Sequence, residues 1–423
     1  MKINEIYELY KANPCVTTDS RNCPKSSLFF AMKGASFNGN EFAKSAIDSG
    51  CSYAFVDEEK YADGKSVFYV ESCLSSLQQL AKLHRETLGT KIIGITGTNG
   101  KTTTKELVSA VLQQKYNTLY TQGNFNNHLG VPLTLLRLTD KHEVAVVEMG
   151  ANHPGEIREL VEIVRPNYGI ITNIGKAHLE GFGSFEGVVR TKVALYEFIR
   201  ETNGEILINY DNEVLRSISA DIKSFRYGKD SKYDVSADVR SSDPFLSLNW
   251  NGRVVSTHLI GDYNFENVLA AIAVGRRMDV ADDLITAAIE KYEPQNNRSQ
   301  FKDTGRNRLI IDAYNANPTS MKASLLNFLQ MDRPNKIVVL GDMKELGADS
   351  DQEHAAIANL LVGEALKDVF LIGSCFMEST NLFHRFETTE SFLDWLKLNP
   401  ITDCNVLIKG SNSMHLTKVV DLL

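Results

Sequence analysis

A short apolar run that leads into a glycine-rich turn constrains this chain more than any other feature of its sequence. The run Lys-Ile-Ile-Gly-Ile occupies residues 91–95, the turn Thr-Gly-Thr-Asn-Gly occupies residues 96–100, and Lys101 and Thr102 follow. Apolar residues between positions 107 and 112 then recur at helical spacing. The pattern predicts a buried strand, a tight loop and the start of a helix, in that order.

Such a loop has the properties of a phosphate-binding site. Gly97 and Gly100 allow the backbone to curl so that several N–H groups point at one anion. The helix N-terminus adds partial positive charge there. Lys101 can reach the β- and γ-phosphates of a nucleotide, and the Thr102 hydroxyl can bind Mg²⁺. We therefore predict that a nucleotide such as ATP binds through its phosphates to Gly97, Thr98, Asn99, Gly100, Lys101, Thr102 and Thr103.

One position departs from the strict pattern G-x-x-x-x-G-K-[ST], because Ile95 stands where the first glycine would be. The alternative interpretation is a glycine-rich surface turn. The order of strand, loop, Lys-Thr and helix favours the phosphate site. Kinases, motors, GTPases and ligases all use such loops, so the loop by itself does not identify a reaction.

The rest of the chain divides into three α/β blocks, which we expect to be domains at residues 1–86, 87–296 and 297–423. In the second block, β-branched runs alternate with helical stretches, which indicates a parallel sheet with crossover helices. The third block follows a polar run at residues 294–299 and alternates in the same way, which is typical of a second doubly wound, Rossmann-like domain.

Within the second block, residues 230–260 show a different pattern. Leu246, Leu248 and Trp250 alternate with polar residues, and Asn251-Gly252 is a strong signal for a two-residue hairpin turn. This stretch predicts a small antiparallel patch.

The bulk composition excludes some functions. The net charge is −8, which argues against a nucleic-acid-binding or anionic-membrane surface. No run of about 18 apolar residues suggests a membrane span, and the first residues do not resemble a signal peptide. The six cysteines include no C-x-x-C pair, so reduced thiols are expected. We expect a cytoplasmic monomer.

Several stretches resemble a known family. Residues 97–103 resemble the phosphate loop of the Mur ligases and of the related folylpolyglutamate synthetases. Further stretches resemble the branch of that family that joins D-alanyl-D-alanine to UDP-MurNAc-tripeptide. These are residues 19–21, 28–34, 123–132, 148–156, 312–318 and 341–347. The resemblance covers nearly the whole chain, and sibling ligases differ at residues 124–127 and 312–318.

The resemblance implies a reaction and a fold. ATP phosphorylates the terminal carboxylate of UDP-MurNAc-tripeptide, and the amine of D-alanyl-D-alanine attacks the acyl phosphate to give UDP-MurNAc-pentapeptide, ADP and phosphate. The fold would comprise a small N-terminal uridine-binding α/β domain, a central ATPase-like parallel sheet and a Rossmann-like C-terminal domain. Alternatives are a tripeptide-forming Mur ligase, folylpolyglutamate synthetase, or a nucleotide-binding regulatory protein without ligase chemistry.

The resemblance also implies the catalytic residues, which are Lys101, Glu148, His178 and Lys192. Two Mg²⁺ ions would be held by Thr102, Glu148, His178 and Lys192, with Lys192 carbamylated by CO₂. From the sequence alone, Glu148 could instead be a solvated acid at the end of a strand. His178 could be a structural hydrogen-bonding residue, and Lys192 could lie on the solvated face of a helix.

The remaining candidates are ligand contacts. Asn267, Arg298 and Asp312 would contact ATP, and Asp312 would close over the ATP site as the third domain moves. The UDP-substrate would contact Ser20, Arg21, Lys33, Asn124 and Asn127, and D-alanyl-D-alanine would lie beside Tyr314, Asn315 and Asn317. The alternatives are turn formers, helix caps or a hinge ion pair. Asn412 replaces an arginine that the family often has, and Lys409 could partly compensate for it.

Overall fold

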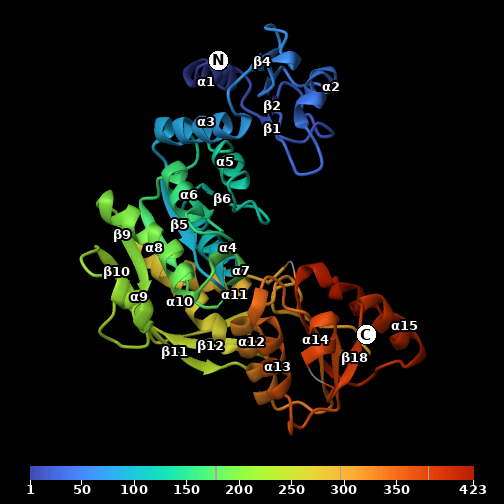
Figure 1. Ribbon diagram of the computed structural model, residues 1–423. Helices are drawn as coiled ribbons and strands as arrows, with labels where there is room; N and C mark the ends of the chain where they lie inside the picture. Colours follow the sequence, from blue (N-terminus) through green and yellow to red (C-terminus); the bar gives the residue numbers. More distant parts are fainter. Residues whose placement is uncertain (177–178, 296, 380) are drawn as a thin grey trace.

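The computed structural model describes residues 1–176, 179–295, 297–379 and 381–423. Three β-sheets follow one another along the chain, and Figure 1 shows them as three successive lobes from the blue N-terminus to the red C-terminus. This confirms the predicted three-part α/β architecture. Within the described residues, no helix is long and apolar enough to cross a membrane.

The first lobe contains a four-stranded parallel sheet in the order β1-β2-β3-β4. Helix α3 leaves this lobe and runs to the second sheet; it begins after the Ser72 side-chain cap and ends at Gly89, whose φ of 66° suits a glycine. The elements are α1 (Ile3–Ala12), β1 (Val16–Thr17), β2 (Leu28–Phe30), α2 (Ala43–Asp48), β3 (Tyr53–Val56), β4 (Val67–Tyr69) and α3 (Cys73–Leu88).

The central sheet has nine strands in the order β13-β12-β11-β10-β9-β8-β5-β7-β6. Its strands are β5 (Lys91–Thr96), β6 (Thr118–Tyr120), β7 (Val144–Glu148), β8 (Tyr168–Ile171), β9 (Glu205–Asn209), β10 (Ser224–Gly228), β11 (Val235–Ser241), β12 (Phe245–Trp250) and β13 (Arg253–Ile260). Its helices are α4 (Lys101–Leu112), α5 (Gly130–Leu135), α6 (Glu156–Val164), α7 (Leu179–Phe182), α8 (Phe185–Glu201), α9 (Glu213–Ile218), α10 (Phe265–Arg277) and α11 (Asp282–Lys291). All pairs from β6 to β11 are parallel.

The predicted antiparallel patch is confirmed, although it continues the central sheet as its edge. β12 pairs antiparallel with both β11 and β13. Asn251 and Gly252 connect β12 to β13 with φ angles of 48° and 73°. Positive φ at both positions is the geometry that selects Asn-Gly in a two-residue hairpin.

The third sheet has six strands in the order β14-β15-β19-β16-β17-β18, with the edge strand β14 antiparallel to β15 and the rest parallel. Its elements are β14 (Gln300–Asp303), β15 (Arg308–Asp312), α12 (Pro318–Gln330), β16 (Lys336–Gly341), α13 (Ser350–Asn359), β17 (Asp368–Ile372), α14 (Ser374–Ser379), β18 (His384–Phe386), α15 (Thr389–Leu398) and β19 (Asn405–Lys409). The doubly wound third block is confirmed.

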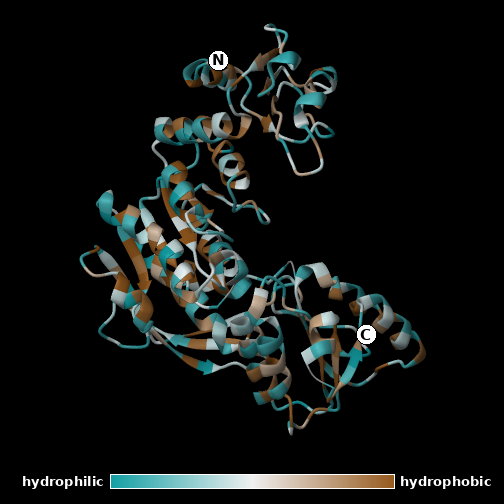
Figure 2. Cartoon of the chain, in the orientation of Figure 1, coloured by the Kyte–Doolittle hydropathy of each residue, from teal (hydrophilic) through white to brown (hydrophobic). Residues whose placement is uncertain are grey.

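Buried apolar side chains cover both faces of the two larger sheets. In β16, Val338 and Leu340 belong to the core on one face, and Ile337 and Val339 belong to the core on the other. Figure 2 shows apolar residues along the strands and hydrophilic residues on the outer helices. Because the strand bodies are apolar, polar chemistry is confined to the strand ends.

Candidate active site

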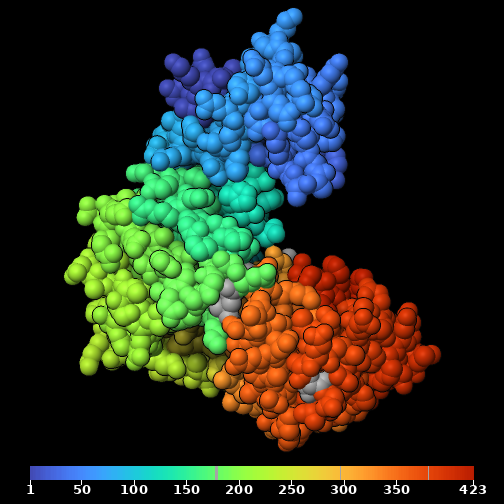
Figure 3. All heavy atoms as spheres, viewed as in Figure 1, coloured from blue at the N-terminus to red at the C-terminus, as the bar shows by residue number. Residues whose placement is uncertain are grey.

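A cavity of about 1130 Å³ lies where the phosphate loop faces the third lobe. The molecule is visibly hollowed on one side between its first and third lobes (Figure 3). Among the predicted residues, those that line the cavity are Thr98, Asn99, Gly100, Lys101, Thr102, Thr103, Asn124, Asn127, Glu148, Asn267, Arg298, Asp312, Tyr314 and Asn315. Asn412 and Lys409 line it as well.

The phosphate loop has the predicted strand, loop and helix geometry. β5 ends at Thr96, and α4 begins at Lys101 directly after Gly100. Gly97 and Gly100 have φ angles of 149° and 78°. A Cβ atom at Gly97 would lie 1.9 Å from Thr172 Oγ1, and one at Gly100 would lie 2.3 Å from Asn267 Oδ1. Both conformation and close approach therefore require glycine at these positions.

The Lys101 ammonium is held within the loop. Its Nζ donates to the carbonyl oxygens of Gly97 and Thr98, at 2.8 and 2.9 Å. Desolvation lowers the pKa of Lys101 to about 8, although the charge of Glu148 acts in the opposite direction. The loop thus holds a cation at the position where a nucleotide phosphate would need one.

Glu148 ends β7 and is buried. Its Oε1 accepts hydrogen bonds from the Thr102 hydroxyl at 3.2 Å and from Asn126 Nδ2 at 2.8 Å. Its Oε2 is buried and has no hydrogen-bond partner among the described residues. A buried carboxylate oxygen is costly to leave unsatisfied, and carboxylate and hydroxyl oxygens are the ligands that Mg²⁺ prefers. The residues present therefore fit a divalent cation, and the solvated-acid interpretation of Glu148 is wrong.

Asn126 was missed by the sequence analysis, which selected its neighbours Asn124 and Asn127. Asn127 Oδ1 accepts from the backbone N–H groups of Leu129 and Gly130, so it organises the turn into α5 as well as lining the cavity. Asn126 contacts Glu148 directly. The sequence alone does not show which of the three asparagines in this loop contacts Glu148, because that depends on the backbone conformation of the loop.

Lys192 lies on α8 with 2% of its surface exposed. Its ammonium is 5.9 Å from the centre of the Phe182 ring, and within the described residues it has no ion pair. Burial, and to a smaller extent the charge of Lys101, hold the pKa of Lys192 well below its usual value. The solvated-face interpretation of Lys192 is wrong. Lys192 is not among the residues that line the cavity, and His178 lies outside the described residues.

The third lobe contributes an acid and a lysine to the opposite wall. Asp312 ends β15, and its Oδ2 lies 2.5 Å from the Nζ of Lys409. Its Oδ1 accepts from the backbone N–H of Ser299 at 3.3 Å. Lys409 is 1% exposed, and its charge is paired with that of Asp312. Its partial compensation for Asn412 stays a prediction.

Arg298 and Asn267 also line the cavity. The Arg298 guanidinium is 3.8 Å from the centre of the Tyr314 ring, and its Nε is buried without a hydrogen-bond partner among the described residues. Asn267 accepts from the Thr104 hydroxyl at 3.0 Å, which connects α10 to the start of α4. A buried N–H donor of this kind suits a polar ligand in the cavity.

Asn317 does not line the cavity, yet it connects two lobes. Its side chain caps α12 by accepting from the Ser320 N–H, and its Nδ2 donates to Asn99 Oδ1 at 2.7 Å. Lys176 and Glu353 form an ion pair at 3.0 Å across the same boundary. The phosphate loop and the third lobe are therefore in direct contact.

The predicted uridine contacts lie in the first lobe, away from the phosphate loop. Arg21 is exposed and paired with Asp19 at 2.9 Å. Lys33 is paired with Asp57 and Glu58, at 2.9 and 3.3 Å. Neither these residues nor Ser20 line the cavity, so the structure does not bring them to the ATP side.

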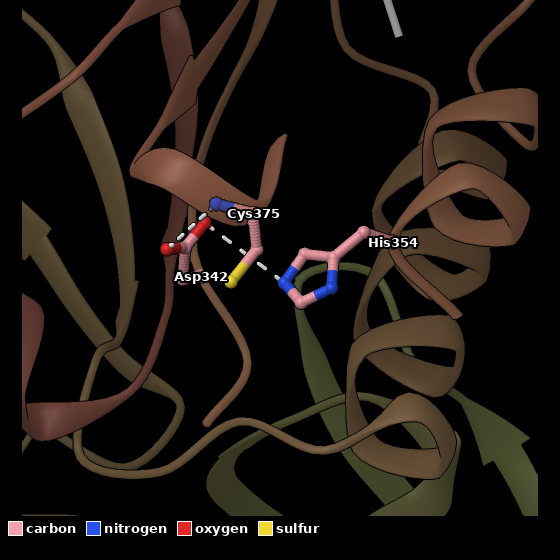
Figure 4. Close-up of side chains that lie close together, drawn as sticks. All are labelled: Asp342, His354 and Cys375. Carbon is pink, nitrogen blue, oxygen red and sulfur yellow. Dashed lines mark hydrogen bonds and ion pairs between the residues drawn. The ribbon is translucent and has the colours of Figure 1, made fainter. Parts of the chain in front are cut away.

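A buried network anchors the segment that carries Glu345, another cavity residue. Asp342 accepts from the backbone N–H of Cys375 at 3.2 Å (Figure 4). It also accepts from the backbone N–H of Phe376 at 3.2 Å. His354 Nε2 accepts from the Met343 N–H at 3.0 Å, so its Nδ1 carries the proton and donates to the Ser350 carbonyl at 2.7 Å. Because these donors and acceptors satisfy one another, the cluster is structural.

An α/β chain with three sheets, a phosphate loop that lacks the first glycine and a buried carboxylate that faces the third lobe has the features expected of an ATP-dependent ligase. Family profiles agree. The Mur ligase catalytic domain matches residues 14–86, the Mur ligase middle domain matches residues 95–275, and the Mur ligase glutamate ligase domain matches residues 297–409. The chain belongs to the Mur ligase family.

Individual relatives place the chain more narrowly. It is 32% identical to the UDP-N-acetylmuramoyl-tripeptide–D-alanyl-D-alanine ligase of Bacillus subtilis, over 96% of this chain and 92% of that protein. It is 31% identical to the enzyme of the same name from Escherichia coli, over 96% and 93%. The crystal structure of MurF from Acinetobacter baumannii superposes with a TM-score of 0.87 at 30% identity, over 98% and 97% of the two chains. MurF from Thermotoga maritima in complex with ADP shares the fold with a TM-score of 0.85.

Proposed function

We propose that this protein is the ATP-dependent ligase that adds D-alanyl-D-alanine to UDP-MurNAc-tripeptide in peptidoglycan synthesis. Similarity over nearly the full length of enzymes with this activity supports the proposal. The observation that carries it is the shared cavity, in which the phosphate loop and Glu148 face Asp312, Tyr314 and Asn315 of the third lobe. Such a cavity can bring ATP, a peptide carboxylate and an attacking amine together.

The reaction requires several anions to approach one another, so the chain must supply cations and exclude water. Lys101 would bind the β- and γ-phosphates as it leaves the carbonyls that it now contacts. Arg298 and Asn267 would hold the nucleoside, and Asp312 would close over the ATP site. Tyr314 and Asn315 would orient the incoming dipeptide, and Asn317 would support this side of the site through its contact with Asn99.

Mg²⁺ fits beside Glu148 and Thr102, with His178 and a carbamylated Lys192 as further ligands in this proposal. The metal would supply charge neutralisation at the transferring phosphate. Carbamylation requires a neutral amine, and burial favours the neutral form of Lys192. The carbamate would turn a buried base that has no carboxylate partner among the described residues into an oxygen ligand.

The UDP-substrate would reach from the first lobe to the cavity. Ser20, Arg21 and Lys33 would bind its uridine diphosphate end, and Asn124 and Asn127 its muramoyl-peptide end. Arg21 has the exposure and geometry for a phosphate, because its guanidinium is held by a single exposed aspartate. We propose that residues 1–86 form the domain that binds the UDP-substrate, residues 87–296 the domain that binds ATP, and residues 297–423 the domain that binds D-alanyl-D-alanine and closes over ATP. We also propose that the enzyme acts in the cytoplasm.

A coupled assay that measures both ADP release and amide formation tests this function. UDP-MurNAc-tripeptide, D-alanyl-D-alanine and ATP together should give equal amounts of ADP and UDP-MurNAc-pentapeptide. Release of ADP with UDP-MurNAc-dipeptide and a diamino acid, but not with this set, would assign the tripeptide-forming reaction instead. ATP hydrolysis without peptide would indicate a switch or motor.

A further inference from the structure

A second pocket lies beside the central sheet, at the opposite ends of the strands from the phosphate loop. Its volume is about 450 Å³, within the range of about 300–1,000 Å³ that small-molecule sites occupy. Lys91 begins β5, whereas the phosphate loop follows the end of that strand. A six-residue strand spans roughly 17 Å, so the two sites are distinct. Ligands in doubly wound proteins ordinarily bind at the carboxyl edge, and this pocket is at the amino edge.

The lining of this pocket is strongly basic. Arg85, Lys91, Arg165, Lys223 and Arg277 line it, and Glu205 is the single acid among its lining residues. The cations come from five different segments, including the end of α3 and the end of α10. Convergence of separate segments on one concave surface is typical of a binding site, whereas a solvated face spreads its charges along one element.

Nearby acids neutralise part of this charge. Glu205 accepts from Arg277 at 2.6 Å and lies 3.4 Å from Lys223. Arg165 is paired with Glu86 at 3.1 Å and, more distantly, with Glu162 at 3.9 Å. Within the described residues, Lys91 and Arg85 have no acidic partner at ion-pair distance.

Arg85 is the central feature, because it is buried with 7% of its surface exposed. Its Nε donates to the Val164 carbonyl at 2.9 Å, and its Nη2 donates to the Arg165 carbonyl and to Asn167 Oδ1, at 2.9 and 3.2 Å. These acceptors are neutral and fix the guanidinium plane. Its Nη1 has no partner among the described residues, although the side chain lines the pocket. A guanidinium that is held in one orientation and keeps N–H groups without a partner among the described residues can bind an anion.

The aromatic residues of the pocket are already covered. The Arg277 guanidinium lies 5.6 Å from the centre of the Tyr168 ring, and the Arg165 guanidinium lies 5.7 Å from that of Phe198. These contacts occupy the ring faces that would stack on a base. The pocket therefore favours a charged group over a nucleobase.

We propose that this pocket binds a small anion that carries two or more linked phosphate groups. Several guanidinium and ammonium groups around one concave space match a multivalent phosphate better than a single carboxylate. The proposal does not depend on the ligase activity. Two kinds of ligand carry linked phosphate groups, namely a free oligophosphate and a nucleotide, which would bind through its phosphate tail.

Titration calorimetry with tripolyphosphate tests the proposal on the full chain. A Lys101→Ala background weakens the phosphate loop as a competing site. In that background, Lys91→Gln with Lys223→Gln should lower the affinity about tenfold, because exposed charges each contribute modestly. Both residues are exposed, so the fold should be retained. The matched control is Lys65→Gln with Lys302→Gln, which removes two exposed lysines elsewhere and should leave the affinity unchanged. Equal losses in both pairs, or none in the first, would overturn the proposal.

Amide hydrogen exchange locates the ligand in the folded protein. Tripolyphosphate should protect residues 164–168 and 202–205 in the Lys101→Ala background, and Arg85→Gln should abolish that protection. Repeating the measurement with ATP separates the two kinds of ligand: protection by both indicates that a nucleotide tail suffices, and protection by tripolyphosphate alone indicates free oligophosphate. Protection confined to residues 96–104 would contradict the proposal.

Discussion

At the scale of single residues, Lys101, which we propose to bind the ATP phosphates, has a lowered pKa. Its pKa of about 8, against 10.5 in an unfolded chain, means that the free enzyme loses this positive charge just above neutral pH. We expect kcat/KM for ATP to be level below pH 8 and to fall as pH rises above it. Stability should change in the opposite direction. Between pH 8 and 10.5 Lys101 is protonated in the unfolded chain but not in the folded one, so its contribution to the free energy of unfolding rises with pH over this range.

Lys101→Arg is the control for this pH dependence. A guanidinium stays charged throughout the range, so the fall above pH 8 should disappear from whatever activity remains. The measurement is a pH profile of kcat/KM for ATP on both proteins. An identical alkaline limb in the variant would assign the titration to another group.

Lys192 gives a second prediction at this scale. If its buried neutral amine is carbamylated, removal of bicarbonate should lower activity, and Lys192→Ala should be inactive until formate supplies a replacement oxygen ligand. Phosphate release with all three substrates measures both effects. Lys65→Ala is a suitable control, because that lysine is exposed in the first lobe and its variant should be insensitive to formate. Full activity of unrescued Lys192→Ala would contradict the proposed role.

Asn126 gives a third prediction, because its amide fixes one oxygen of Glu148. Asn126→Ala should lower activity or apparent Mg²⁺ affinity about 10–100-fold, the usual effect of removing a group that orients a metal ligand. A titration of activity against Mg²⁺ measures it. Gln122→Ala alters an exposed residue of the same loop and should have little effect. Wild-type Mg²⁺ dependence in Asn126→Ala would refute the positioning role.

The role of a single residue could be predicted from the sequence where a local motif determines it, but not where the packing of distant segments determines it. Lys101 and Thr102 could be predicted from the sequence, because a phosphate loop demands them at fixed positions. The burial of Lys192 and the contact from Asn126 to Glu148 could not, since both depend on how α8 and the 123–127 loop pack against the sheet. The pairing of Lys409 with Asp312 likewise joins residues that are distant in sequence.

At the scale of elements, Gly100 shows what the phosphate loop requires of its backbone. Gly100→Ala should lose ATP affinity and free energy of unfolding, because its Cβ would meet Asn267 and its φ is positive. Gly64→Ala isolates the second cause, since Gly64 has a φ of 68° and open space around it. It should cost about 1 kcal/mol, the penalty of a left-handed alanine. Calorimetric unfolding and ATP titration of both variants compare the effects, and equal losses would exclude the steric contact.

Elements were predictable where local signals determine them. The hairpin at Asn251-Gly252 was found because its φ angles select those residues. Strand β14 was not predicted, because Gln300–Asp303 is polar and lies at an antiparallel edge, where solvent faces much of the strand. Its pairing with β15 is a tertiary property.

At the scale of the whole molecule, the direct contact between Asn99 and Asn317 connects ATP binding to the position of the third lobe. Small-angle scattering should show a smaller radius of gyration when ATP, UDP-MurNAc-tripeptide and D-alanyl-D-alanine are all bound. Asn317→Ala should reduce this compaction and lower kcat. Lys336→Ala, which changes a lysine that bonds within its own lobe, should preserve it. An unchanged scattering curve in the wild type would argue against closure.

The apolar core of the first lobe has a thermodynamic consequence. It is continuous with the core on one face of the central sheet, from Tyr10 and Leu77 through Val147 and Leu195, whereas the two cores of the third sheet are separate from it, although Ile260 of β13 contributes to one of them. Residues that share a core melt together, so a calorimetric scan should resolve a large transition for the first two lobes and a smaller one for the third. The isolated fragment 1–86 should be unstable, since the part of the second lobe that belongs to the same core would be missing. The cooperative unit of the molecule is therefore larger than its sheets suggest.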